Sequence, residues 1–277
     1  MAARLSELGG LMTFSIAKLT RLPKEERNRI YLQLVPPSLF TRFFIDQKTL
    51  LNTYGEHVVT GIFPLDENFS CIEVRHRAGD KDCIFSCQIS LEAFMQSLHL
   101  DFIIINDPGS ERFHIDVDEE GKDTFFGSRT RNISQEIRAM ESGLAPGMVK
   151  KGLRLMKEFA RCLDTFLSSI ELQNITTDAF FYHNAILWER YGFTYFRGGK
   201  MMERIDQEFQ PGGMLYEKLD GSTPFRRKGM EKTVRGRSWA IHDGVYLDAF
   251  DEEWESPIMY KTLGREYHVN TFPDQIY

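Results

Sequence analysis

Three titratable residues alternate along a short segment that begins at Phe113. His114, Asp116 and Asp118 are two positions apart, so in an extended strand all three side chains would project from one face. An imidazole and two carboxylates placed in this way could act as a general base or ligate a metal ion. They could also form the solvent-facing edge of an ordinary strand. No complete metal-ligand set accompanies them, and the sequence leaves the three interpretations open.

The C-terminal part of the chain combines arginine with glycine at unusual density. Residues 220–227 and 235–244 hold most of these positions. Guanidinium groups bind phosphate and carboxylate through paired donors, so this segment is predicted to bind an anion or a substrate in a functional loop. The alternative is salt bridging to the acidic run 248–255. The candidate residues are Arg226, Arg227, Arg235, Arg237 and His242.

Hydrophobic periodicity predicts the elements that must position these residues. Short strand-like runs separated by turns are expected at 57–63, 69–75, 83–89, 102–105, 113–118, 175–181 and 193–196. The runs at 69–75 and 83–89 are expected to form a hairpin, and 102–105 a fully buried strand. Helices are expected at 24–34, 42–51, 91–98, 148–170 and 184–191. This pattern is typical of a mixed α/β (α+β) protein with a central mixed sheet flanked by helices.

Periodicity also suggests the domain organisation. The helix expected over 148–170 has the clearest apolar stripe in the chain, whereas the sequence after Gly198 shows little periodicity and many turns. We therefore expect a main domain at residues 1–199 and a C-terminal extension at residues 200–277, packed on the main domain.

A long helix, a strand and a short helix that ends in Trp188-Glu189-Arg190-Tyr191-Gly192-Phe193 follow one another in this sequence. This order resembles the second half of the GNAT superfamily of N-acetyltransferases, in which the fourth helix closes with an aromatic residue, two polar residues and Gly-Phe. The glycine would end the helix in a left-handed conformation, and Phe193 would enter the sheet as the next strand begins. The resemblance covers mainly residues 148–197 and implies a GNAT-like central sheet.

The resemblance implies acetyl-CoA or another acyl-CoA as the cofactor. In this family the pantetheine arm lies in a gap between two splayed parallel strands, here expected to be the Phe113 and Ile175 strands. The pyrophosphate lies on backbone amides that open the third helix, and a Gly-containing turn before a helix favours an anion. The residues expected to bind the cofactor are Gly143, Leu144, Ala145, Gly147, Met148, Lys150 and Lys151.

The implied reaction is transfer of an acetyl or acyl group to a small-molecule amine. His114, Asp116 or Asp118 would serve as base, Tyr182 or Tyr191 as acid, and a main-chain N–H of the Phe113 strand would polarise the thioester carbonyl. At two positions the chain departs from the family pattern: Met140 stands where the signature before Gly143 has Arg or Gln, and Trp188 replaces the usual catalytic tyrosine. The alternatives are a non-catalytic GNAT-fold protein that binds a small anion, and a metal-dependent enzyme built on the His and Asp residues.

Composition limits the remaining classes. The 277 residues carry a net charge of -6 and include 4 cysteines without a CxxC pair, which argues against a nucleic-acid partner and against a disulfide framework. No Gly-x-Ser-x-Gly elbow, P-loop or Gly-x-Gly-x-x-Gly motif is present. No apolar run is long enough for a membrane span and no signal peptide is recognisable. We expect a cytoplasmic protein that does not bind membranes, and the sequence leaves open whether it forms a homodimer.

Overall fold

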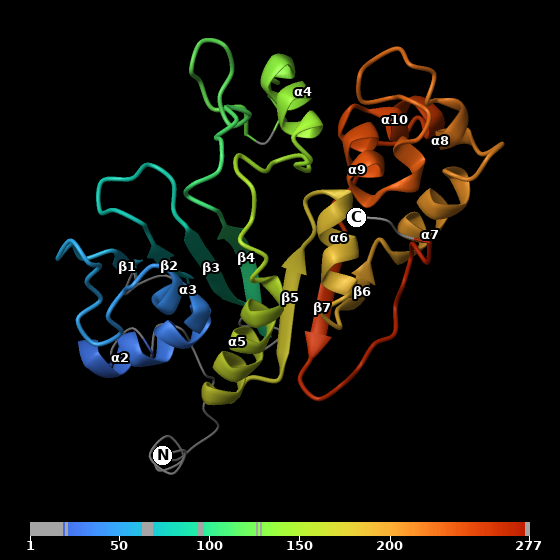
Figure 1. The fold of residues 1–277 in the computed structure, drawn as a ribbon. Coiled ribbons are helices and arrows are strands. Elements are labelled where there is room, and N and C mark those ends of the chain that lie inside the picture. Colours follow the sequence, from blue (N-terminus) through green and yellow to red (C-terminus); the bar gives the residue numbers. More distant parts are fainter. Residues whose placement is uncertain are drawn as a thin grey trace. The chain divides into compact units, whose positions relative to one another are not determined.

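The fold is given by a computed structural model (Figure 1), which describes Leu19 and residues 22–62, 69–92, 97–125, 127 and 129–274. The chain divides into two compact units. Unit 1 draws on residues 1–108, 152–177 and 261–265, and unit 2 on residues 109–151, 178–260 and 266–277. The expected boundary after residue 199 coincides with neither unit, because residues 178–260 belong to one unit.

Unit 1 is built on a mixed sheet, which together with its helices confirms the predicted mixed α/β class. The strands lie in the order β1 (Val59–Ile62), β2 (Phe69–Val74), β3 (Phe85–Glu92), β4 (Ser97–Ile105) and β5 (Asn174–Asp178). Neighbours from β1 to β4 are antiparallel, whereas β4 and β5 are parallel. The predicted hairpin is confirmed as β2 and β3.

Three helices cover one face of this sheet (Figure 1): α2 (Lys24–Tyr31), α3 (Pro37–Arg42) and α5 (Met156–Ser169), with the 3₁₀ turn η2 (Leu32–Leu34) after α2. The apolar stripe of α5 carries Phe159 and Phe166, both fully buried. The Phe159 ring packs edge-on against Phe85 of β3, with 5.9 Å between ring centroids. Phe166 lies 5.9 Å from Tyr31 of α2, whose hydroxyl is 2.7 Å from the hydroxyl of Ser70 on β2. The stripe of α5 therefore joins α2 to the sheet.

Unit 2 is mainly helical. It contains α4 (Ile133–Glu141), α6 (Tyr182–Glu189), α7 (Gly199–Glu208), α8 (Met214–Glu217), η3 (Met230–Lys232), α9 (Val234–His242) and α10 (Val245–Phe250). β6 (Thr194–Arg197) pairs antiparallel with β7 (Ile258–Thr262), in which the chain passes from unit 2 into unit 1. The segment after Gly198, where little regular structure was expected, thus forms short helices. Over the described residues, no helix combines the length and apolar character that crossing a bilayer requires.

Two predicted elements next to the expected site are wrong. The helix expected over 148–170 begins only at Met156, because Gly147 (φ 78°) and Arg154 (φ 61°) adopt left-handed conformations that interrupt a helix. The segment 113–118 forms no regular strand. It ends in a turn closed by a single bridge between Val117 and Asp123.

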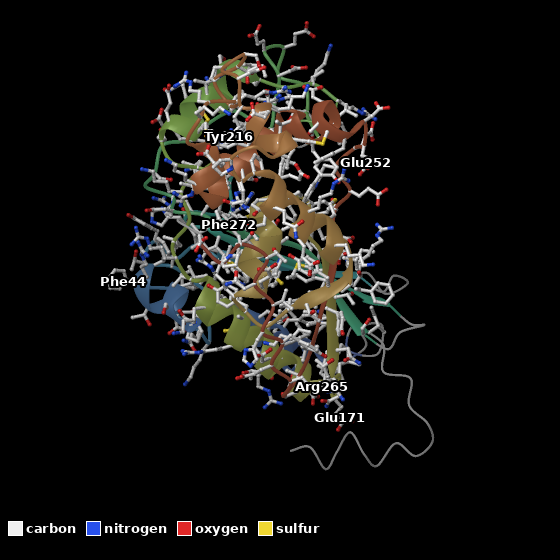
Figure 2. All side chains as sticks on the ribbon, turned by 90° about the vertical axis from the view of Figure 1, so that its right-hand side faces the viewer. Phe44, Glu171, Tyr216, Glu252, Arg265 and Phe272 are labelled. Carbon is white, nitrogen blue, oxygen red and sulfur yellow. The ribbon has the colours of Figure 1, made fainter. Side chains whose placement is uncertain are left out.

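Two further helix predictions in unit 1 are wrong. α3 ends at Arg42, and the left-handed backbone of Phe44 (φ 51°) and Leu50 (φ 59°) prevents a helix over 42–51. Phe44 projects into solvent with 74% of its surface exposed (Figure 2). The helix expected over 91–98 is replaced by the ends of β3 and β4, and its residues 93–96 lie outside the described residues.

The contact between α5 and β3 predicts a large loss of stability when Phe159 is truncated. Phe159→Ala removes a fully buried ring and should lower the free energy of unfolding by roughly 3–5 kcal/mol. The measurement is urea unfolding followed by far-UV circular dichroism. Thr165→Ala, an exposed position on the same helix, is the matched control and should stay within about 0.5 kcal/mol. A loss below about 1 kcal/mol for Phe159→Ala would contradict this packing.

Candidate functional site

The parallel pairing between two strands of unit 1 covers only the first part of the longer strand, β4. β4 pairs with β5 through only four residue pairs, from Ser97–Asn174 to Leu100–Thr177. At the end of this ladder, the Thr177 hydroxyl donates to the Leu100 carbonyl at 2.9 Å. β4 continues to Ile105 while still paired with β3 on its other side, whereas β5 ends at Asp178. Five residues of β4 therefore extend beyond the parallel ladder.

A β-bulge in β4 lies at the same point. Gln88 and Ile89 are consecutive on β3, but their partners on β4 are Phe102 and Leu100, which leaves Asp101 as the extra residue. The Ser90 hydroxyl donates to the Asp101 carboxylate at 2.9 Å and so ties the bulge to β3. Because a bulge bends its strand and increases the local twist, it gives β4 a local reason to separate from β5.

The part of β4 beyond the ladder is apolar. The predicted strand Phe102–Ile105 is confirmed, but its residues are half-buried rather than fully buried as expected. In open sheets with parallel strands, ligands bind outside the carboxyl ends of the strands, where neighbouring strands diverge. The end of β4 has this position together with an apolar surface suited to a ligand.

The segment that opens α5 passes the same end of β4. A Cβ atom at Gly152 would lie 3.3 Å from the carbonyl oxygen of Ile105, so a side chain here would press on the strand. Arg154 has a left-handed backbone that non-glycine residues seldom adopt and that occurs preferentially at functional sites. Leu155 is the N-cap of α5 and makes no side-chain capping bond. The first N–H groups of α5 therefore have no side-chain cap.

The turn predicted to bind pyrophosphate has a different position. Gly143 (φ 82°) lies at the C-terminal end of α4, where the Leu144 N–H donates to the Ala139 carbonyl at 3.0 Å. This end of a helix carries the partial negative charge of the macrodipole, and Leu144 and Ala145 are buried. The segment 142–147 therefore does not open a helix. In the segment that connects α4 to α5 along the chain, Met148 and Lys150 are half-buried and Lys151 is exposed.

The three residues predicted to share one strand face do not lie on a strand, and only His114 and Asp116 share a partner. Arg112 donates to both His114 and Asp116, at 3.0 Å each, and the Asp118 carboxylate accepts two backbone N–H groups of its own turn. The Phe113 N–H, expected to polarise the thioester carbonyl, instead donates to the Val149 carbonyl at 2.8 Å. Across the residues described, no group of three or more His, Cys, Asp or Glu side chains has an arrangement that could hold a metal ion. The metal alternative therefore has no ligand cluster to support it.

The two tyrosines predicted as acids differ in access. Tyr182 is 1% exposed, and burial raises the pKa of its hydroxyl far above the usual range. This hydroxyl lies 3.4 Å from Arg237. Tyr191 is half-buried in the turn after α6, and partial burial raises its pKa to a smaller extent. Of the two, only Tyr191 has access to solvent. Trp188, at the position of the usual tyrosine, is buried against Phe193.

Three of the five predicted anion-binding residues, Arg226, Arg237 and His242, are paired inside unit 2. Arg237 is 2% exposed, bonds Asp206 at 2.7 Å and stacks over Phe272, which is labelled in Figure 2. Arg226 pairs with Asp243 and with Asp248 of the acidic run, as the salt-bridge alternative predicted. Arg227 and Arg235 are exposed. Two of the four candidate arginines, Arg226 and Arg237, thus form ion pairs within unit 2.

His242 belongs to a buried ionic cluster that the sequence did not reveal. Arg131 donates to Glu136 at 2.6 Å and to Asp243 at 2.8 Å, and the His242 ring is 3.3 Å from the other oxygen of Glu136. Burial alone would raise the pKa of Glu136, but hydrogen bonds from His242 and Arg131 outweigh it and lower the pKa. A histidine oriented by a carboxylate has the composition of a general-base pair.

A second histidine, His183, lies in the interior of unit 2. His183 is buried, and its ring nitrogen lies 2.9 Å from the Ser238 hydroxyl. Burial, followed by the nearby charges of Arg235 and His242, lowers the pKa of His183 to about 3. The ring is therefore neutral near pH 7, and it stacks on Phe181 as part of the core.

Comparisons with protein-family models, with curated proteins and with solved structures found no match to this chain.

The ionic cluster predicts a pH-dependent contribution to stability. Glu136→Gln removes one of the two carboxylates paired with Arg131 and should lower the free energy of unfolding at pH 7 by roughly 1–3 kcal/mol. Because the pKa of Glu136 is lowered in the folded state, its contribution is complete above the ordinary value of 4.5 and is lost as the pH falls through the folded value. The difference between wild type and variant should therefore shrink in acid.

Urea unfolding at several pH values, followed by tryptophan fluorescence, measures this difference. Glu141→Gln, an exposed glutamate at the end of the same helix, is the control and should show little difference at any pH. A gap for Glu136→Gln that stays constant from pH 7 to acid would contradict the assignment.

Proposed function

We propose that the chain is a GNAT-type N-acyltransferase that uses acetyl-CoA or another acyl-CoA and a small-molecule amine. The observation that carries this proposal is that the parallel pairing of β4 with β5 ends at Leu100 and Thr177, while β4 continues to Ile105. The order β4, α4, α5, β5, α6, β6 supports it, since the long helix α5 precedes the second of the two parallel strands and a short helix follows it.

The end of β4 suits an extended arm that contains amide groups. Beyond the parallel ladder, the edge of β4 that β5 leaves can pair with amides in the way that an added strand pairs with a sheet edge. The half-buried side chains of Phe102–Ile105 supply apolar contacts to the methylene groups of such an arm. The proposal therefore replaces the Phe113 segment with β4 as the partner of β5.

The opening of α5 suits a pyrophosphate. Free N–H groups and the macrodipole favour an anion at a helix N-terminus, and α5 has no side-chain cap there. Lys157 in its first turn is exposed. Gly152–Leu155 replaces Gly143–Gly147 as the proposed anion-binding loop, and Lys157 takes the role predicted for Lys150 and Lys151, which belong to unit 2.

Acyl-CoA supplies an acyl group activated as a thioester. When the acceptor nitrogen displaces the thiolate, the chain must remove one proton from the amine and return one to sulfur. The candidates for the base are His114, Asp116 and Asp118. Arg112 engages the first two, and a turn engages the third. All three belong to unit 2, so their place beside the thioester rests on the resemblance alone. Tyr191 is proposed as the acid because the Tyr182 hydroxyl is enclosed.

Calorimetric titration of the purified chain with acetyl-CoA, longer acyl-CoAs and CoA tests the proposal. Saturable binding is expected, and Lys157→Glu should weaken it roughly tenfold by placing a negative charge beside the phosphates. The matched control is Lys81→Glu, the same charge change on the exposed β2–β3 turn, which should leave the affinity within about twofold.

The outcomes separate binding from catalysis. No binding of any of these compounds would overturn the proposal. Binding with no CoA release in the presence of a panel of amines would retain the cofactor site and overturn the catalytic part, in favour of a GNAT-fold binding protein. CoA release that His114→Ala leaves unchanged would exclude His114 as the base.

A further inference from the structure

Unit 1 contains a groove that the acyltransferase proposal does not use. It lies between α2, η2, α3, residues 47–50 and the exposed side of α5, with a volume of about 740 Å³. This is within the range of small-molecule sites, roughly 300–1,000 Å³. All of its lining residues belong to unit 1.

The floor of the groove is apolar and fixed. Val35, Phe40 and Leu50 line it and are at most 9% exposed, and the half-buried Cys162 adds its thiol. Leu50 holds a left-handed backbone (φ 59°), fixed by the hydrogen bond from its N–H to the Asp46 carbonyl at 2.7 Å. A bulky residue in this conformation is strained. The strained backbone thus places an apolar side chain on the floor of an open groove.

The rim of the groove carries positive charge. Three exposed basic residues line it: Arg29 of α2, Lys48 in the loop after α3, and Arg161 of α5. None of the three forms an ion pair with a carboxylate in the described part of the chain.

Two acidic residues, Glu25 and Glu158, also line the groove. The Glu158 carboxylate accepts the backbone N–H of Ser38 at 2.8 Å, so part of its hydrogen-bonding capacity is used within the fold. The three cations outnumber the two acids, which gives the lining an excess of positive charge.

We propose that this groove binds a small amphiphilic anion: a carboxylate with an apolar chain of roughly ten carbons, which is small enough to fit within the groove. The chain packs on Val35, Phe40 and Leu50, and the carboxylate meets Arg161 and its basic neighbours on the rim. Guanidinium groups bind carboxylates through paired donors, and the apolar floor selects against small hydrophilic anions. The site does not depend on acyltransferase activity.

Decanoate is the probe, titrated calorimetrically into the whole chain with decanol and decyltrimethylammonium as uncharged and cationic controls of equal chain length. One decanoate is expected to bind with a Kd of roughly 0.05–1 mM, as its size allows. The two control compounds should bind at least about tenfold more weakly, because they lack the charge that meets the rim.

Two charge reversals provide a matched test. Arg161→Glu should weaken decanoate binding roughly tenfold by reversing a charge on the rim. Lys81→Glu, on the exposed β2–β3 turn and outside the groove lining, should leave it within about twofold. Neither variant changes Lys157, so the acyl-CoA titration is an independent measurement. Failure of the acyl-CoA titration alone would therefore not affect this site.

Three results would overturn the proposal: no binding of decanoate up to several millimolar, equal binding of decanoate and decyltrimethylammonium, or Arg161→Glu with unchanged affinity and an unchanged circular dichroism spectrum. The second result would identify the groove as a purely apolar surface. Cys162→Ala, which removes a thiol from the floor without changing the rim charge, should retain the preference for decanoate over decyltrimethylammonium.

Discussion

The backbone pairing between β4 and β5 constrains the rest of unit 1. Four parallel pairs hold the strands together, after which the bulge at Asp101 bends β4 and the ladder ends. A parallel connection needs a crossover helix, and α5 provides it while burying its apolar stripe against β3 and α2. The same crossover brings the opening of α5 back to the end of β4, where Gly152 passes Ile105. One backbone constraint thus places the extended end of β4 and the N-terminus of α5 together.

Unit 2 depends on paired charges as well as on apolar packing. Arg131 forms ion pairs with Glu136 and Asp243, all three largely buried, and Arg237 is enclosed with Asp206 and Phe272. Buried charge is costly unless it is paired and hydrogen-bonded, so these groups specify how α4, α7 and α9 pack. The arginines of the C-terminal segment therefore act first as structural residues.

The local hydrophobic pattern predicted most strands of unit 1, because short runs of Val, Ile, Phe and Cys between turns favour strands. It failed where the conformation is set by distant contacts. The apolar spacing of 148–170 is continuous, yet Arg154 breaks the helix; Gly152, just before it, was the available signal. α7–α10 are too short to show a long stripe. The cluster of Glu136 with His242 joins residues 106 positions apart, which a single sequence does not indicate.

The most direct test of the account is hydrogen exchange of the backbone amides with and without saturating CoA. If the site lies where the parallel strands separate, protection should increase at residues 101–105 of β4 and in the first turn of α5, and it should change little in β1 and β2. Protection confined to unit 2, or no change at the end of β4 under conditions where CoA is bound, would contradict the account.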